Sequence, residues 1–250
     1  MARFKVGVQL QPQHTSVDEL RRAWVAADEL GVDSVSVWDH FFPLSGEPEG
    51  SHFEGWTLLA AMAADTSRAK VAVLVTCNSY RNPDLLADMA RTVDHISGGR
   101  AVLGIGAGWF ERDYDEYGYD FKTPGARLGA LGEALPRIKR RLAALNPPPV
   151  GELPIMIGGG GEKVTLRLVA EHADWWNGFG PPESFAHKNE VIDGWCREVG
   201  RNPSEIVRTC TISADDVANA AAFADAGAGH LFVQCPHPFD LGPAERLLSG

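Results

Sequence analysis

Hydrophobic and polar residues alternate along the chain in two recurring patterns. Short apolar runs of the kind found in buried strands occur at 4–10, 34–38, 71–76, 101–105, 153–157, 174–177, 206–212 and 230–234. Between them, apolar residues recur at helical spacing over 17–30, 55–66, 83–96, 127–145, 163–171, 184–199 and 215–225, with a short last segment near 243–248. Strands that alternate with helices in this way are typical of βα units around a parallel sheet.

Capping residues mark the ends of several of these helices. Ser16 precedes the first helix and Glu19 stands three residues later, which is the spacing of a capping box. Pro83 opens another helix, at the first helical position that proline favours. Gly31 and Gly200 follow two more and suit left-handed C-caps. These signals support the helix positions independently of the apolar pattern.

The number of elements predicts the architecture. About eight strands and about eight helices in 250 residues indicate a single α/β domain, a (β/α)₈ TIM barrel, for which this length is usual. An open, doubly wound sheet is the alternative. The only linker-like stretch, the Pro-rich residues 146–151, is short enough to be a stiff surface connection. We therefore treat 1–250 as one compact domain.

The charge and cysteine content exclude several classes of function. The formal net charge of −10 and pI of about 5.2 argue against a nucleic-acid-binding or membrane-surface protein, since both need a basic face. The four cysteines stand too far apart for a zinc knuckle or a disulfide framework. No apolar run suits a signal peptide or approaches the ~20 residues of a membrane span. We expect a cytoplasmic protein that acts on a small molecule.

Four consecutive glycines form the most informative local motif. Gly158, Gly159, Gly160 and Gly161 join an apolar strand to a helix start. Backbone without Cβ atoms can approach a ligand closely, and a helix N-terminus offers unpaired N–H groups to a phosphate. Lys163 adds a mobile positive charge. We interpret the motif as an anion cradle; the alternative is a tight strand-to-helix turn, in which one or two glycines are common.

The carboxyl ends of the strands are where a barrel carries its active site. Among the residues that follow the predicted strands, only Asp39 and His40 supply both a carboxylate and an imidazole. Histidine suits proton transfer at neutral pH; a solvated polar strand end is the other interpretation. The sequence shows no set of Asp, Glu and His converging from several strands, so we expect no metal site.

A glycine-rich run near the middle of the chain invites a dinucleotide-binding interpretation. The fingerprint G-x-G-x-x-G begins at Gly104 but requires glycine where this chain has Trp109. The Rossmann interpretation therefore fails. The glycines instead suit close contact between the barrel mouth and a flat ring, and Trp109 with Phe110 suits an aromatic wall beside it.

Several motifs together resemble those of a known family. They are residues 38–41 (WDHF), 80–83 (YRNP), 94–100 (DHISGGR), 104–111 (GIGAGWFE) and 154–161 (PIMIGGGG), followed by 173–177 (ADWWN). In this combination the chain resembles the luciferase-like monooxygenase superfamily, and in particular its branch of oxidoreductases that use the deazaflavin coenzyme F420. The resemblance covers about residues 4 to 177.

The resemblance implies a TIM barrel that binds F420, or alternatively FMN, in its mouth, with the phosphate on the glycine loop. It implies a non-prolyl cis peptide near Leu74–Val75 and makes His40 the candidate proton donor or acceptor. A hydride would then pass between the cofactor and a small organic substrate. The implied cofactor-binding residues are Asp39, Leu74, Val75, Thr76, Cys77, Gly106, Ala107, Gly108, Gly158, Gly159, Gly160, Gly161 and Lys163.

Two departures from the sugar-phosphate dehydrogenases of this branch make glucose-6-phosphate a poor substrate candidate. Trp109 stands where those enzymes have glutamate, and Leu44 stands where they have tryptophan. The Pro-rich bridge at 146–151 is also shorter than in longer members, which implies an open site. An FMN-dependent monooxygenase, a non-catalytic flavin-binding barrel and a metal-dependent barrel enzyme are the competing functions, and a homodimer is left open.

Overall fold

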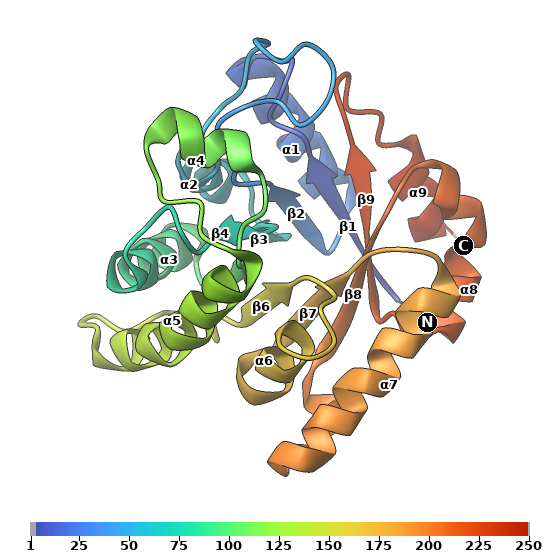
Figure 1. Ribbon diagram of the computed structural model, residues 1–250. Helices are drawn as coiled ribbons and strands as arrows, with labels where there is room; N and C mark the ends of the chain where they lie inside the picture. The colour runs from blue at the N-terminus through green and yellow to red at the C-terminus, as the bar shows by residue number, and fades with distance from the viewer. Residues whose placement is uncertain (1–3, 250) are drawn as a thin grey trace.

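A computed structural model describes residues 4–249 and shows a closed parallel barrel surrounded by helices (Figure 1). Its strands are β1 (Lys5–Leu10), β2 (Ser34–Val37), β3 (Lys70–Val73), β4 (Thr76–Cys77), β5 (Ala101–Gly106), β6 (Ile155–Gly158), β7 (Trp175–Gly178), β8 (Val207–Ile212) and β9 (His230–Cys235). They follow the order β3-β2-β1-β9-β8-β7-β6-β5-β4, and β3 also pairs with β5, which closes the barrel. Since β3 and β4 are two halves of one interrupted strand, the barrel has eight strand positions. The predicted (β/α)₈ fold is therefore confirmed.

The helices lie outside the barrel, as Figure 1 shows. They are α1 (Val17–Leu30), α2 (Gly55–Asp65), α3 (Pro83–Ser97), α4 (Glu111–Tyr117), α5 (Pro124–Ala144), α6 (Thr165–His172), α7 (Pro182–Val199), α8 (Ala220–Asp225) and α9 (Gly242–Ser249), with 3-10 turns at Pro203–Glu205 and Asp215–Asn219. None of the predicted helices covered α4. In the part of the chain that the structure describes, no helix is both long enough and apolar enough to cross a membrane.

The predicted helix caps are present. Ser16 and Glu19 form the reciprocal capping box of α1, and Gly31 ends that helix in the left-handed conformation with φ of 94°. Pro83 occupies the first turn of α3, and Gly200 ends α7 with φ of 72°. The local sequence signals therefore determine where these helices begin and end.

The barrel interior is filled by a small cluster of its own, separate from the larger core between barrel and helices. Its members are Ala72, Leu74, Val102, Met156, Trp175 and Phe232, from five different strands. His230 lies among them, fully buried, with its ring stacked on Phe232 at a centroid distance of 4.5 Å. The interior is therefore solid side-chain packing, and a ligand can enter only at an end of the barrel.

Charged side chains bind the backbone at the amino end of the barrel. Asp28 accepts hydrogen bonds from three consecutive backbone amides, those of residues 67–69, just before β3. Arg100, just before β5, donates five hydrogen bonds to α2, α3 and the start of β3. Asp33 and Asp174 each accept the amide of the first or second residue of a neighbouring strand. This end is closed by side-chain to backbone contacts.

The Pro-rich bridge lies at this same amino end, which differs from the sequence-based interpretation. The amides of Val150 and Gly151 both donate to Asp94 at 2.8 Å, at the end of α3. No residue of 145–154 lines the cavity at the carboxyl end. The shortness of the bridge therefore does not open the site, because a connection from helix to strand returns to the amino end of a barrel.

Candidate active site

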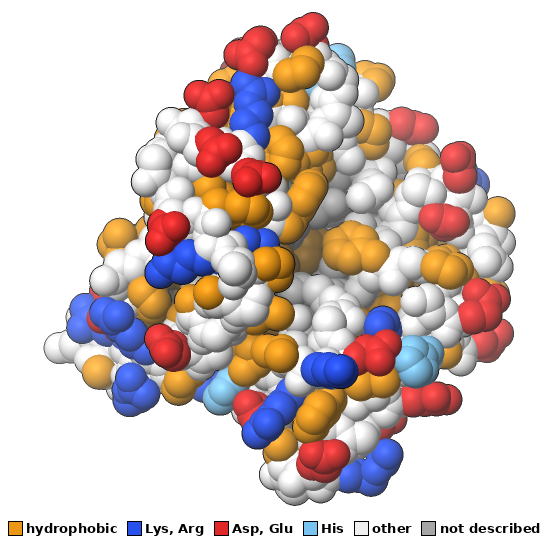
Figure 2. Space-filling model, in the orientation of Figure 1, with side chains coloured by type: hydrophobic (Ala, Val, Ile, Leu, Met, Phe, Trp, Pro, Cys, Tyr) orange, Lys and Arg blue, Asp and Glu red, His pale blue; other side chains and the backbone are white. Residues whose placement is uncertain are grey.

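A cavity of about 410 Å³ opens at the carboxyl end of the barrel. Figure 2 shows it as a hollow in the middle of the face, bordered by hydrophobic side chains. Eleven of the predicted site residues line it: Asp39, His40, Leu74, Val75, Thr76, Cys77, Gly106, Ala107, Gly108, Gly158 and Gly159. Gly160, Gly161 and Lys163 are exposed on the loop beyond the cavity lining. The structure thus brings most of the predicted site residues together around one cavity at the carboxyl end of the barrel.

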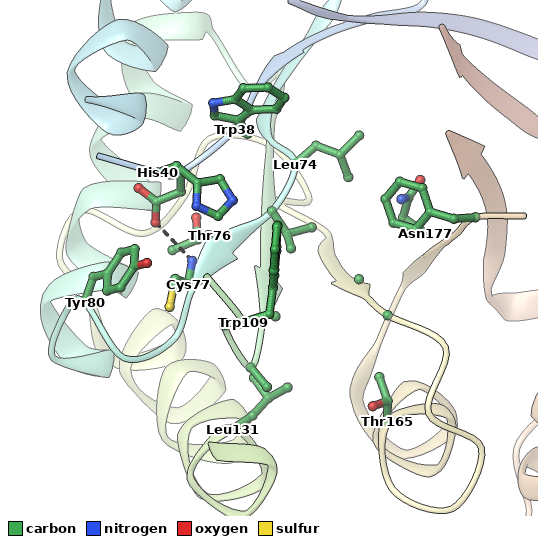
Figure 3. A pocket seen from close by; sticks show the side chains of 18 of the residues that line it. Trp38, His40, Leu74, Thr76, Cys77, Tyr80, Trp109, Leu131, Thr165 and Asn177 are labelled. Carbon is green, nitrogen blue, oxygen red and sulfur yellow. Dashed lines mark hydrogen bonds between the residues drawn. The ribbon is translucent and has the colours of Figure 1, made fainter. Parts of the chain in front are cut away.

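His40 stands at the wall of this cavity with its ring surrounded by aromatic side chains. The rings of Trp38, Trp109 and Phe110 meet it edge to face at centroid distances of 5.5 to 6.1 Å. Nδ1 lies 2.7 Å from an oxygen of Asp113, and within residues 4–249 no hydrogen bond is formed by Nε2. Figure 3 shows the imidazole beside the open space across which Asn177 lies. The expected aromatic wall is therefore present, and it holds the histidine.

Asp39 is buried and already has strong partners. Arg81 binds both of its carboxylate oxygens, at 2.7 and 2.9 Å, and the amide of Cys77 donates to one of them. Burial raises the pKa of the Asp39 carboxyl, and the Arg81 guanidinium opposes that rise. Arg81 also pairs with Glu54 at 2.6 Å. Asp39 therefore holds the segment that follows the third strand in place at the cavity wall.

The third strand is interrupted where the cavity begins. The Leu74–Val75 peptide is cis, as the family resemblance implied. The Nε2 amide of Gln9 donates to the Leu74 carbonyl at 2.8 Å. Val75 projects between two strand ends, so that a Cβ added at Gly106 or Gly158 would lie 3.0 Å from its side chain. A side chain at either glycine would therefore be in tight contact with Val75, which would have to shift by a few tenths of an ångström.

The four glycines of the loop differ in how strongly the local geometry disfavours a side chain. Gly159 has φ of 122°, which side chains disfavour, and a Cβ at Gly161 would meet Thr165 at 2.9 Å. Gly160 differs, because an added Cβ would have only the end of Lys188 within 4 Å, at 3.8 Å. Helix α6 begins only at Thr165, two residues later than expected. Three of the four glycines are thus explained by local geometry, and Gly160 is not.

Besides Lys163, a second positive charge near the loop comes from a residue that the sequence did not indicate. Lys188 of α7 lies beside Gly160 and pairs with Glu162. Two other basic residues form ion pairs away from the loop. Arg81 pairs with Glu54, and Arg112 pairs with Glu49. The basic residues around the cavity are therefore largely paired with acidic neighbours.

Other residues of the cavity were not among the predicted site residues, because they lie far from strand ends in sequence or are recognisable only by their partners. Leu128 and Leu131 reach the cavity from α5, and Thr165 from α6. Asn177 is fully buried, and its Oδ1 lies 2.9 and 3.2 Å from the hydroxyls of Thr209 and Thr211. Its Nδ2 has no partner among the described residues although Asn177 lines the cavity. A buried, unpartnered amide of this kind is available to a ligand.

Within residues 4–249, no group of three or more His, Cys, Asp and Glu is placed to hold a metal ion. His52 instead accepts the indole N–H of Trp38 at 2.9 Å, and burial lowers its pKa to about 4. Glu54 caps α2, and His237 bonds to Glu19. The four cysteines are free thiols, all buried.

Among curated proteins, the chain is 29% identical to a Mycobacterium tuberculosis protein provisionally named coenzyme F420-dependent oxidoreductase, over 89% of this chain and 70% of that protein. It is also 29% identical to the phthiodiolone/phenolphthiodiolone dimycocerosates ketoreductase of Mycobacterium bovis, over 74% of this chain but only 58% of the relative. The chain therefore spans between about half and three quarters of the length of these relatives.

Solved structures share the fold at low sequence identity. An F420-dependent secondary alcohol dehydrogenase in complex with an F420–acetone adduct matches with a TM-score of 0.86 at 16% identity, over 98% of this chain and 97% of the other. The FMN-bound oxygenating component of 3,6-diketocamphane monooxygenase from Pseudomonas putida matches with a TM-score of 0.77 at 16% identity, over 99% and 96%. The family model for luciferase-like monooxygenases matches residues 1–237, and the protein therefore belongs to the luciferase-like monooxygenase family.

Proposed function

We propose that this protein is an F420-dependent oxidoreductase that interconverts a small alcohol and its carbonyl compound. The observation that carries the proposal is His40, held in an aromatic wall at the cavity in the barrel mouth, with Nε2 unpartnered among residues 4–249. In this reaction the cofactor accepts or gives the hydride, and His40 accepts or gives the proton of the substrate oxygen. Membership of a family with F420-dependent members supports the same assignment.

The described residues fit a deazaflavin with a phosphate-bearing tail. The interrupted strand at Leu74–Val75 and the Cβ-free strand end at Gly106 both line the cavity, where the ring of the cofactor would pack. The free amide of Asn177 is able to donate a hydrogen bond to a carbonyl oxygen of a bound ring. Gly160 leaves the glycine loop open to an anion, with Lys188 beside it. Each of these features is matched by a part of the cofactor.

The substrate side of the cavity favours an uncharged molecule. Trp109 and Phe179, which are 63% and 55% exposed, line the cavity, and so does Leu44. Among the described lining residues, the only members of the set Asp, Glu, His, Lys and Arg are His40 and Asp39. Asp39 is paired with Arg81. A phosphate or carboxylate on the substrate would meet no free cation in this described lining. A secondary alcohol and its ketone, the chemistry named for the structural neighbour that matches at 0.86, suit this wall.

The first test compares cofactor binding by the purified protein. We expect F420 to bind more tightly than FMN in parallel titrations at low and high salt, with the preference only modestly reduced by salt. Reduced F420 mixed with a simple ketone in the absence of oxygen should then be oxidised at a rate that depends on ketone concentration. Equal or tighter FMN binding, together with NAD(P)H-driven oxygen consumption, would instead assign the protein to FMN-dependent monooxygenation, as the diketocamphane neighbour suggests.

A non-catalytic barrel that only stores a flavin is the remaining alternative. It predicts binding without any ketone-dependent oxidation of the reduced cofactor and no effect of changing His40. The engagement of His40 by a buried carboxylate argues against it, since mere storage gives no reason for an oriented imidazole.

A further inference from the structure

Asp113 is a buried carboxylate outside the cavity lining, and its hydrogen-bond partners surround both of its oxygens. It lies on α4, the helix absent from the sequence-based expectation, and its side chain is fully buried. His40 Nδ1 lies 2.7 Å from Oδ2, and the hydroxyl of Tyr80 donates to the same oxygen at 2.8 Å. The backbone amide of Phe41 donates to Oδ1 at 3.0 Å.

These contacts determine which nitrogen of His40 carries the proton in the neutral ring. An ionised carboxylate has no proton to donate, so each partner of Asp113 must supply one. Burial together with Asp113 raises the pKa of Tyr80, so its hydroxyl remains a donor. A carboxylate oxygen 2.7 Å from Nδ1 likewise requires a proton on that nitrogen. The lone pair of the neutral ring is then on Nε2.

We infer that Asp113 is a positioning residue that holds His40 in the Nδ1–H tautomer, with Nε2 as the proton acceptor at the cavity. This inference rests on the proposed function for its catalytic consequence. In alcohol oxidation the O–H bond of the substrate breaks and its proton passes to Nε2, while the C–H bond breaks and its hydride leaves with the electron pair to oxidised F420. The positive imidazolium that forms is stabilised by the Asp113 carboxylate behind it.

Replacing Asp113 with asparagine tests this arrangement with little change in shape. The fixed Phe41 amide retains the oxygen of the new carboxamide at the Oδ1 position, so the NH₂ group takes the place of Oδ2 and donates to His40 Nδ1. The ring must then carry its proton on Nε2, where it can no longer accept one. We expect D113N to keep its cofactor dissociation constant and to lose about 10²–10⁴-fold in the rate of alcohol oxidation.

The direct readout is the tautomer of His40 in the cofactor-free protein, measured by ¹⁵N chemical shifts and assigned by comparison with His40→Ala. We expect the Nδ1–H form in the parent and the Nε2–H form in D113N. The matched control is Asp115→Asn, which removes one carboxylate from the exposed side of the same helix and should change neither property. Tyr80→Phe removes one donor to Asp113 and should leave the Nδ1–H tautomer in place.

Two results would overturn the inference. One is a His40 that keeps the Nδ1–H tautomer in D113N; the other is a tautomer that changes while the oxidation rate stays within about threefold of the parent. Failure of the proposed function is distinguishable, because a parent protein that does not oxidise alcohols with F420 would still show whether Asp113 sets the tautomer.

Discussion

Two histidines face the barrel from opposite ends and have opposite surroundings. His40, at the carboxyl end, is paired with Asp113 and has its other nitrogen at the cavity. His230, in the interior toward the amino end, is completely buried with both ring nitrogens unpartnered among the described residues, and burial lowers its pKa to about 3. Under the proposed function the first exchanges a proton, whereas burial keeps the second neutral. The same side chain thus borders an open cavity at one end of the barrel and fills space inside the barrel at the other.

Aspartates divide between the ends in the same manner. At the amino end, Asp28, Asp33 and Asp174 accept hydrogen bonds from backbone amides and so tie strands and helices together. At the carboxyl end, Asp39 and Asp113 hold side chains, the guanidinium of Arg81 and the imidazole of His40. Changes at the amino end should therefore affect stability, and changes at the carboxyl end should affect binding and rate.

The largest effect is expected at His40. Replacement with alanine removes the proton acceptor and should lower single-turnover hydride transfer by about 10²–10⁴-fold. Cofactor affinity should change little, whereas the urea midpoint should fall because the buried Asp113 carboxylate loses its imidazole partner. Stopped-flow measurement of F420 absorbance checks the rate. Unaltered transfer with an unchanged pH profile would remove His40 from the mechanism.

Arg100→Leu should produce the opposite result. The change removes five hydrogen bonds to α2, α3 and the start of β3 and should lower the free energy of unfolding by about 2–4 kcal/mol, at about 1 kcal/mol or less for each bond. Urea unfolding measures this loss. The cofactor dissociation constant measured well below the unfolding midpoint should stay within about twofold. A large loss of cofactor affinity without loss of stability would contradict the assignment of stability to the amino end and of binding to the carboxyl end.

Gly160→Val tests the anion cradle at its one structurally permissive glycine. The added side chain has room in the free protein, so the melting temperature should be unchanged. If the backbone here approaches the cofactor phosphate, F420 affinity should fall about 10- to 100-fold, the equivalent of one or two charge-assisted hydrogen bonds. Titration by fluorescence checks this. A folded variant that binds F420 as tightly as the parent would show that the phosphate lies elsewhere.

The last prediction concerns the acid sensitivity of His230. Its pKa in the folded protein, about 3, lies below the ordinary value of 6.5. The unfolded state therefore binds the proton more readily, and the stability contributed by the neutral ring is present above pH 6.5 and is lost as pH falls from 6.5 toward 3, by up to about 1.4 kcal/mol per pH unit. His230→Leu should flatten this slope in urea unfolding between about pH 7 and pH 4.5. An equally steep slope in the variant would assign the acid sensitivity to other groups.

Sequence patterns predicted most of the fold because they depend on neighbours along the chain. Most strand and helix positions and the capping box at Ser16 and Glu19 follow from local periodicity and capping. The partners of the site did not follow. Asp113 lies in the polar segment 111–117, which has no apolar periodicity, and its contact with His40 joins residues 73 positions apart. Which partner a buried charge chooses depends on three-dimensional proximity.

The contacts made by Asp28 and Arg100 have a consequence for how freely this sequence can vary. Nearly all their hydrogen bonds go to main-chain amides and carbonyls, which almost every residue type provides. The segments that they join can therefore exchange side chains without losing the contact. A barrel end held by side-chain to backbone hydrogen bonds tolerates extensive substitution. This agrees with the TM-score of 0.86 to a solved structure that shares 16% sequence identity. For protein engineering, the surface of the amino end is the place where new sequence can be introduced at least cost to the site.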